Sequence, residues 1–435
     1  MNKRQRWQPG FMSWAVLLLC YCLLAQANVT EETVDRSTLF GKVMCGYQGW
    51  FACPDDGLGR GWYHWGRGHD FCPDRVTIDL WPDVSELDED EKCPTSFVHA
   101  DGSTAYVFSS QHPKTVNRHF KWMQEYGIDG AFVQRFGAEV IAGELQYRQF
   151  TRVLENARRG AYDHGRAYAL MYDLSGLQAG QVALLHDDFN RLLDEGIIFG
   201  DDDAAYLHHR GKPVVSVWGV GFSDDRSYTL AECAELVQFL KTHPAAPGGA
   251  GFTVMLGVPT FWRTLNRDAL DDPFLHDTLR MADIISPWAV GRYTDAAGAE
   301  RLAQQVWKTD MEWCRENDLD FLPVVFPGFS WHNLNPEHPI DHIPRHGGNF
   351  LWAQYRALRE LGATMVYQAM FDEVDEATAI FKCTNDPPVN GTFLTYEGLP
   401  TDHYLWLTGM GGKLIRREIE ATEALPVRCP ETGKE

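Results

Sequence analysis

The acidic stretch "FDEVDEATAIF", residues 371–381, has the residue types best suited to chemistry in this chain. Its four carboxylates belong to Asp372, Glu373, Asp375 and Glu376 and stand between apolar flanks. Like charges this close raise one another's pKa and cost stability. Residues three apart point to opposite faces of a strand but share one face of a helical turn. A turn after Phe371 would therefore bring Glu373 and Glu376 into one cleft.

Two carboxyl groups in one partly desolvated site push their pKa values apart. One group stays ionised as a base or nucleophile, while the other keeps a proton for a leaving oxygen. Glycoside hydrolysis needs this pair of roles. The alternative is an acidic turn that is solvated or binds a cation. An EF-hand calcium loop is disfavoured, because its glycine at position six and glutamate at position twelve are missing.

Eight short apolar runs must position these residues, and they are rich in β-branched and aromatic side chains. They span residues 42–50, 127–136, 166–176, 212–222, 251–262, 283–291, 321–331 and 364–371. Such near-continuous runs are typical of parallel strands that are buried on both faces. Helical patterns lie between them at 114–127, 147–165, 228–241, 299–317 and 350–362, and Thr229 with Glu232 forms a predicted capping box.

This alternation predicts an α/β fold, a single (β/α)8 TIM barrel over residues 28–435. The alternative, a doubly wound open sheet, is disfavoured because no glycine-rich phosphate loop follows the first run. The first connection, residues 51–110, is long and rich in Gly, Pro and acidic residues. Loops of that length are usually lids or binding loops.

Active sites of such barrels lie at the C-terminal ends of the strands, and aromatic residues crowd those ends here. The chain has 15 Trp, and indole rings suit the C–H faces of sugars. The predicted sugar platforms are Trp50, Trp65, Trp218, Trp288 and Trp331. The predicted hydroxyl contacts are Gln134, Arg135, Asp173 and His332, and Tyr47 and His64 complete the substrate-binding set. The alternatives are core or loop packing for the aromatic residues and an Asp173–Arg135 ion pair.

Other constellations are weaker. His208 and His209 are adjacent, so their side chains diverge, and no third metal ligand is evident. The segment "GFSWHN" at 328–333 lacks the G-x-S-x-G spacing of a serine hydrolase. No metal site and no organic cofactor is expected.

The N-terminal segment predicts export. A basic start, the apolar run "FMSWAVLLLCYCLLA" and "AQA" before Asn28 are typical of a signal peptide over residues 1–27. Oxidising conditions would allow a disulfide among Cys53, Cys72 and Cys93. The net charge of −21 argues against nucleic acid and anionic membrane surfaces as partners. No second apolar run is long enough to span a membrane, and we expect a monomer that acts in the periplasm or outside the cell.

Several segments together resemble the glycoside hydrolase family 71/99-like proteins of exported bacterial polysaccharide systems. They are "CGYQGWF", "GWYHWG", "LWPDVSE", "MYDLSGL", "FPGFSWHNL", "MFDEVDEATAIFK" and "TYEGLPTDHYLWLTG". The resemblance covers nearly the whole chain after the signal segment and implies a barrel fold.

The family 99 endo-α-mannosidases are similar at the last strand, where their pattern F-N-E-W-H-E-G-T aligns with "FDEVDEAT". This resemblance implies that Glu373 assists attack by the substrate's own 2-hydroxyl and that Glu376 is the general acid/base. Asp372, Val374, Asp375 and Ala377 depart from the pattern. Mannose specificity and the epoxide-like route therefore do not carry over, and the family 71 side would suggest an α-1,3-glucan.

The sequence thus predicts an exported glycosidase that cleaves a bond, expected to be an α-linkage, in a carbohydrate substrate. Two alternatives from other classes are a non-catalytic glycan-binding barrel and a structural protein with a cation at the acidic turn.

Overall fold

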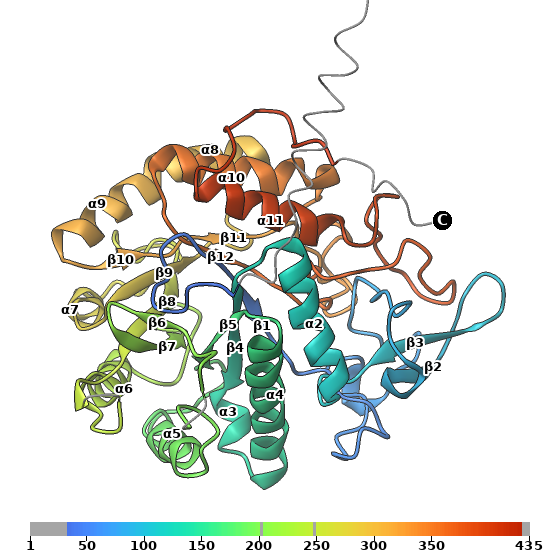
Figure 1. Cartoon of the computed structure of the whole chain (residues 1–435), viewed down its shortest axis with the longest axis horizontal. Coiled ribbons are helices and arrows are strands. Elements are labelled where there is room, and N and C mark those ends of the chain that lie inside the picture. Colours follow the sequence, from blue (N-terminus) through green and yellow to red (C-terminus); the bar gives the residue numbers. More distant parts are fainter. Residues whose placement is uncertain (1–32, 201–202, 247–248, 429–435) are drawn as a thin grey trace, which may run out of the picture.

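Residues 33–200, 203–246 and 249–428 are described by the computed structural model of the chain (Figure 1). Parallel strands lie at its centre, and helices surround them (Figure 1). The predicted signal peptide, residues 1–27, lies outside the described residues. No helix within them is both long and apolar enough to cross a membrane.

The central sheet has the strand order β10-β9-β8-β7-β5-β4-β1-β12-β11. Its parallel strands are β1 (Val43–Tyr47), β4 (Gly130–Phe136), β5 (Ala167–Asp173), β7 (Lys212–Trp218), β8 (Thr253–Pro259), β9 (Ile284–Trp288), β10 (Asp320–Phe321), β11 (Val324–Val325) and β12 (Val366–Gln368). Only Leu322 and Pro323 separate β10 from β11, so these are two halves of one strand. Its first half pairs with β9 and its second half with β12. The sheet therefore closes with eight strand positions, and the predicted (β/α)8 fold is confirmed.

The five predicted helical stretches are helical. They correspond to α2 (Pro113–Tyr126), α4 (Glu144–Asp163), α6 (Leu230–Thr242), α8 (Ala296–Leu302) continued by the π-helical η4 (Ala303–Trp307) and α9 (Lys308–Glu316), and α10 (Asn349–Leu361). The predicted capping box is present, because the Thr229 hydroxyl accepts from the Glu232 N–H and the Glu232 carboxylate accepts from the Thr229 N–H. Within the described residues, four further α-helices are α3 (Gly137–Val140), α5 (Leu184–Asp194), α7 (Phe274–Arg280) and α11 (His403–Ile415).

Strand register decides which side chains face the barrel interior. Gln134 on β4 aligns with Met171 on β5, and Arg135 aligns with Tyr172. Neighbouring residues of a strand point to opposite faces. Gln134 therefore faces inward, beside Tyr367, while Arg135 faces the outer helices.

The long first connection is folded against the barrel. It contains the antiparallel hairpin of β2 (Lys92–Val98) and β3 (Thr104–Phe108), drawn to one side in Figure 1. A disulfide joins Cys53 to Cys93, which confirms the predicted bridge and leaves Cys72 as a thiol. The Asp79 and Leu80 N–H groups both donate to the Val374 carbonyl. The connection therefore packs directly on the acidic turn.

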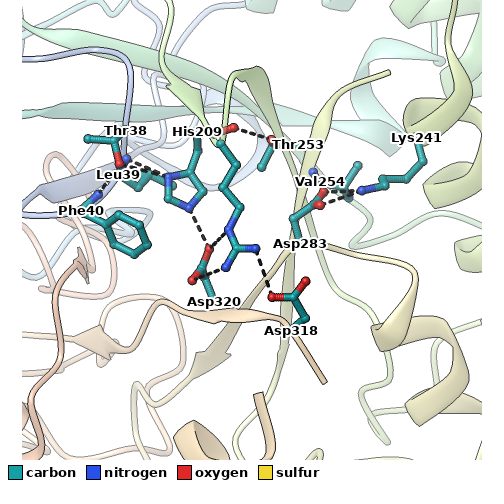
Figure 2. A network of polar contacts seen from close by, with 11 residues as sticks. Thr38, Leu39, Phe40, His209, Lys241, Thr253, Val254, Asp283, Asp318 and Asp320 are labelled. Atoms are coloured by element: carbon teal, nitrogen blue, oxygen red, sulfur yellow. Dashed lines mark hydrogen bonds and ion pairs between the residues drawn. The ribbon is translucent and has the colours of Figure 1, made fainter. Parts of the chain in front are cut away.

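Charged side chains cross-link the N-terminal end of the barrel (Figure 2). His209 of the short β6 (His208–His209) contacts Asp320 at the start of β10, with 2.8 Å between Nε2 and Oδ2. Arg210 donates to both oxygens of Asp320. Lys241 donates to both oxygens of Asp283, just before β9. This end of the barrel is held together by paired charges.

Candidate active site

The acidic residues follow β12 in a tight turn over residues 374–377. The Thr378 and Ala379 N–H groups donate to the Glu373 carbonyl, and Ala377 adopts a left-handed backbone with φ of 50°. Asp372, Glu373 and Asp375 are buried, whereas Glu376 is partly exposed. The sequence predicted such a turn, and the structure places it at the C-terminal end of the barrel.

Asp372 fixes the turn to the end of β1. Its two carboxylate oxygens accept the Gln48 N–H at 2.8 Å and the Gly49 N–H at 2.9 Å. Burial raises the pKa of Asp372 to about 7, although these two hydrogen bonds favour its ionised form. The clamp also holds the Gln48 side chain next to Glu373.

Glu373 is held by two donors. The Gln48 side-chain amide donates to Oε1 at 2.6 Å, and the Thr378 hydroxyl donates to Oε2 at 2.7 Å. Burial and repulsion by Glu376 and Asp375 raise the pKa of Glu373, while both hydrogen bonds oppose the rise. Each carboxylate oxygen is thus provided with a group that favours the charged form.

Glu376 has a different environment. Its side chain has no hydrogen-bond partner in the part of the chain that the structure describes, and only its backbone carbonyl accepts, from the Ser330 N–H at 2.9 Å. Burial and the Asp375 charge raise the pKa of Glu376 to about 8. Repulsion between Glu373 and Glu376 disfavours the state in which both carboxyl groups are ionised. Because Glu373 has two side-chain donors and Glu376 has none, hydrogen bonding favours the ionised form of Glu373 over that of Glu376.

Asp375 connects the turn to the long first connection. His64 Nδ1 lies 3.3 Å from Asp375 Oδ2, and Oδ1 of Asp375 has no partner among the described residues. The His64 ring stacks on Trp50 with ring centres 3.8 Å apart, and Trp50 stacks in turn on Phe136. The predicted contact residues His64 and Trp50 therefore lie together, beside the carboxylates.

A second group of predicted residues lines the opposite strands of the barrel. Trp218 aligns with Asp173 across β5 and β7, so both side chains share the inner face. Trp218 meets Trp288 edge to face at 5.5 Å, and Trp288 meets Tyr367 at 6.2 Å. Tyr367 in turn faces Gln134, Glu373 and Asp173. Two predicted platforms and two predicted polar contacts thus gather on the side of Glu373. Burial raises the pKa of Asp173.

The loop after the seventh strand also reaches the acidic turn. The Asp79 carboxylate accepts from the Ser330 hydroxyl and from the His332 and Asn333 N–H groups. His332 Nδ1 contacts the His338 carbonyl at 2.7 Å, and Trp331 packs on His338. Trp331 and His332 are partly exposed at this end of the barrel.

Three predicted contact residues are placed elsewhere. Tyr47 is fully buried behind the strand, where its hydroxyl lies 2.9 Å from His119 Nδ1. Trp65 is fully buried, and its indole N–H donates to the Phe108 carbonyl. Arg135 forms a buried two-pronged ion pair with Asp188, not with Asp173. Their side chains serve packing or ion pairing within the fold, because each points to the outer face or into the loop core.

Three residues of the site were not predicted as contacts: Gln48, Thr378 and Asp79. Gln48 directly follows β1, and Thr378 is the last residue of the "FDEVDEAT" pattern. The sequence positions of both residues could therefore have indicated that they belong to the site. Asp79 lies inside the long connection, and no local pattern indicates its partners.

Comparisons with known proteins bear on the fold of the chain. No protein-family profile matches the chain. A glycoprotein endo-alpha-1,2-mannosidase-like protein of Danio rerio is 25% identical over 124 residues, which is 27% of this chain. The match also spans only 27% of that relative's length.

Solved structures extend the likeness to most of the chain. A GH99 endo-alpha-mannosidase from Bacteroides thetaiotaomicron matches with a TM-score of 0.60 at 18% identity, over 87% of this chain and 99% of that one. A complex of this GH99 enzyme with bis-tris propane gives 0.61 at 17% identity, over 88% and 99%. A glycoside hydrolase-like protein gives 0.52 at 12% identity, over 87% and 96%. These comparisons confirm the resemblance to the family 99 side, and the chain has a GH99-like (β/α)8 barrel fold.

Proposed function

We propose that the chain is a glycoside hydrolase that cleaves an α-linkage in an oligo- or polysaccharide, with Glu376 as the acid and Glu373 as the base. One observation carries the proposal. Two adjacent carboxyl groups stand at the C-terminal end of the barrel, and only Glu373 has side-chain donors. Such an environment separates the two protonation states that glycoside hydrolysis needs.

The chemistry follows from that asymmetry. Glu376, protonated and partly exposed, donates its proton to the leaving glycosidic oxygen. Glu373, ionised, accepts a proton from the attacking hydroxyl, which belongs to water or to the sugar itself. Gln48 and Thr378 hold Glu373 in place, so little reorganisation is needed during the reaction.

The aromatic residues supply the binding surface. Trp50 with His64 lies next to Asp375, and Trp218 with Trp288 lies next to Tyr367. Sugar units that pack on these rings would place a glycosidic bond at the glutamate pair. The fold shared with the GH99 enzymes supports a glycan substrate, and the N-terminal sequence supports export after cleavage near Ala27.

A screen for reducing-end release tests the proposal. Wild type and Glu376→Gln are incubated with α-mannans, α-1,3-glucans and mixed algal and plant polysaccharides. Glu89→Gln serves as a matched control, because the Glu89 side chain is 88% exposed. We expect one substrate class to be cleaved by wild type and by the control, and the Glu376 variant to lose this activity by roughly 10²–10⁴-fold.

Two outcomes would count against it. Equal activity in wild type and Glu376→Gln would remove Glu376 as the acid. Binding of one glycan without turnover in any protein would instead favour a non-catalytic glycan-binding barrel.

A further inference from the structure

A cavity of about 470 Å³ opens beside the ends of β8 and β9, outside the carboxylate site. Four arginines line it: Arg263, Arg267, Arg292 and Arg301. Its other walls come from residues 293–295, α8 and the π-helical η4. Such a concentration of guanidinium groups is unexpected in a chain with a net charge of −21.

Arg292 is held in place by an anchored carboxylate. Its Nε donates to Asp268 Oδ2 at 2.6 Å. Asp268 itself accepts the Thr260 N–H at 3.1 Å and the Phe261 N–H at 3.0 Å, directly after β8. The Asp268 bond uses Nε, and the two terminal nitrogens of Arg292 have no hydrogen-bond partner within the described residues.

Arg263 is positioned in the same way. Its Nε donates to Asp310 Oδ1 at 2.7 Å, and its Nη2 donates to the Thr309 hydroxyl at 2.7 Å. Asp310 is 1% exposed, so this anchor lies in the wall of the cavity. The guanidinium is thus fixed at its inner edge, and its side chain remains 26% exposed.

The other two arginines make fewer polar contacts. Arg267 lies over the Phe261 ring at 4.3 Å and has no carboxylate or hydrogen-bond partner for its side chain in the described part of the chain. Arg301 has only a 4.0 Å contact with Asp295. The four cationic side chains therefore meet three carboxylates, those of Asp295 and Asp310 in the lining and that of Asp268, which pairs with Arg292. The excess of positive charge favours an anionic ligand.

We propose that this cavity binds an acidic sugar through its sulfate ester or carboxylate group, with Arg267 and Arg292 as the principal donors. The volume falls in the range of small-molecule sites. Guanidinium groups match such oxyanions through paired N–H donors. The hydroxyl of Thr260, a residue of the cavity lining, donates to the Trp288 backbone carbonyl, so the cavity lies near the C-terminal end of β9. A role as a subsite for an acidic polysaccharide rests on the proposed function, whereas binding of the acidic sugar does not.

Calorimetric titration tests the proposal. The probes are a monosaccharide sulfate, its unsulfated counterpart, glucuronate and inorganic sulfate. The proteins are wild type, Arg267→Gln, Arg292→Gln and the control Arg148→Gln, since Arg148 is 66% exposed and lies outside the cavity. We expect wild type and the control to bind the sulfated sugar or glucuronate, with binding that weakens as NaCl is added. Each cavity variant should bind about tenfold more weakly.

The remaining outcomes are decisive. Absence of binding, or equal binding by all four proteins, would overturn the proposal. Inorganic sulfate that binds as tightly as the sulfated sugar would overturn the sugar as the ligand. Titration of Glu376→Gln separates the two hypotheses, because it should keep the anion affinity while losing turnover. Anion binding without turnover in any protein would refute only the glycosidase, and turnover without anion binding would refute only this site.

Discussion

The charge network at the N-terminal end of the barrel and the acidic turn at its C-terminal end treat buried charge in opposite ways. At the N-terminal end, Asp320 contacts both His209 and Arg210, and Asp283 contacts Lys241 (Figure 2). At the C-terminal end, Glu373 has only neutral donors, and Glu376 has no side-chain partner among the described residues. An ion pair offsets the cost of burying its charges, whereas carboxylates without a cationic partner keep that cost and have shifted pKa values. Strongly shifted pKa values are typical of functional sites.

The largest effect is expected from a substitution in the acidic turn. Glu376→Gln removes the proposed proton donor and should lower kcat by roughly 10²–10⁴-fold. Because it also removes a carboxyl group whose raised pKa costs stability at neutral pH, the melting temperature should stay equal or rise. Steady-state kinetics with the substrate found in the screen and thermal unfolding measure both effects. A variant that lost stability together with activity would show that Glu376 is a structural residue.

A substitution in the N-terminal charge network should instead lower stability and leave activity unchanged. Asp320→Asn removes a charge that both His209 and Arg210 contact, and it should lower the free energy of unfolding by roughly 2–3 kcal/mol. The residue lies at the far end of the strands from the carboxylates, so kcat per folded molecule should not change. Denaturant unfolding and kinetics on the folded fraction test this. An unchanged free energy of unfolding would contradict the stabilising role of the network.

The pH dependence of stability should also differ between wild type and Glu376→Gln. The pKa of Glu376 is raised to about 8 in the folded chain, above its usual value. The folded state therefore holds a proton that the unfolded state releases between about pH 4.5 and 8. Stability from this group is present below that window and is lost as pH rises through it, by at most about 1.4 kcal/mol per pH unit. Chemical denaturation at several pH values should show a steeper decline for wild type than for Glu376→Gln. Parallel curves for the two proteins would refute the shifted pKa.

The fold was predictable because its signals are local. Parallel strands buried on both faces give continuous apolar runs, and each of the eight runs contains a strand position. The division of the seventh strand into β10 and β11 at Leu322 and Pro323 was not predicted. The pair of Glu373 and Glu376 was also predictable, because the two residues lie close together in the sequence and in one turn.

The rest of the site depends on contacts that are distant in the sequence. Gln134 and Arg135 are adjacent, yet one faces the barrel interior and the other faces α5. Both faces of β4 are buried, so the sequence pattern cannot tell them apart. Arg135 pairs with Asp188, which lies 53 residues further along the chain. Trp65 was assigned to the substrate, but Phe51 and Phe108 enclose it inside the long connection.

The smallest effect concerns the donors of Glu373. Thr378→Val keeps the shape of the side chain but removes the hydroxyl that donates to Oε2. Losing one such bond should lower kcat/KM by about five- to tenfold, which corresponds to roughly 1 kcal/mol. The ionised form of Glu373 loses support, so the pKa of Glu373 rises and the acidic limb of the pH–rate profile moves to higher pH. Thr278→Val is the matched control, because Thr278 is fully buried and its hydroxyl bonds only to Phe274 of its own helix. A fall in activity without movement of the acidic limb would mean that Thr378 supports the turn and does not tune Glu373.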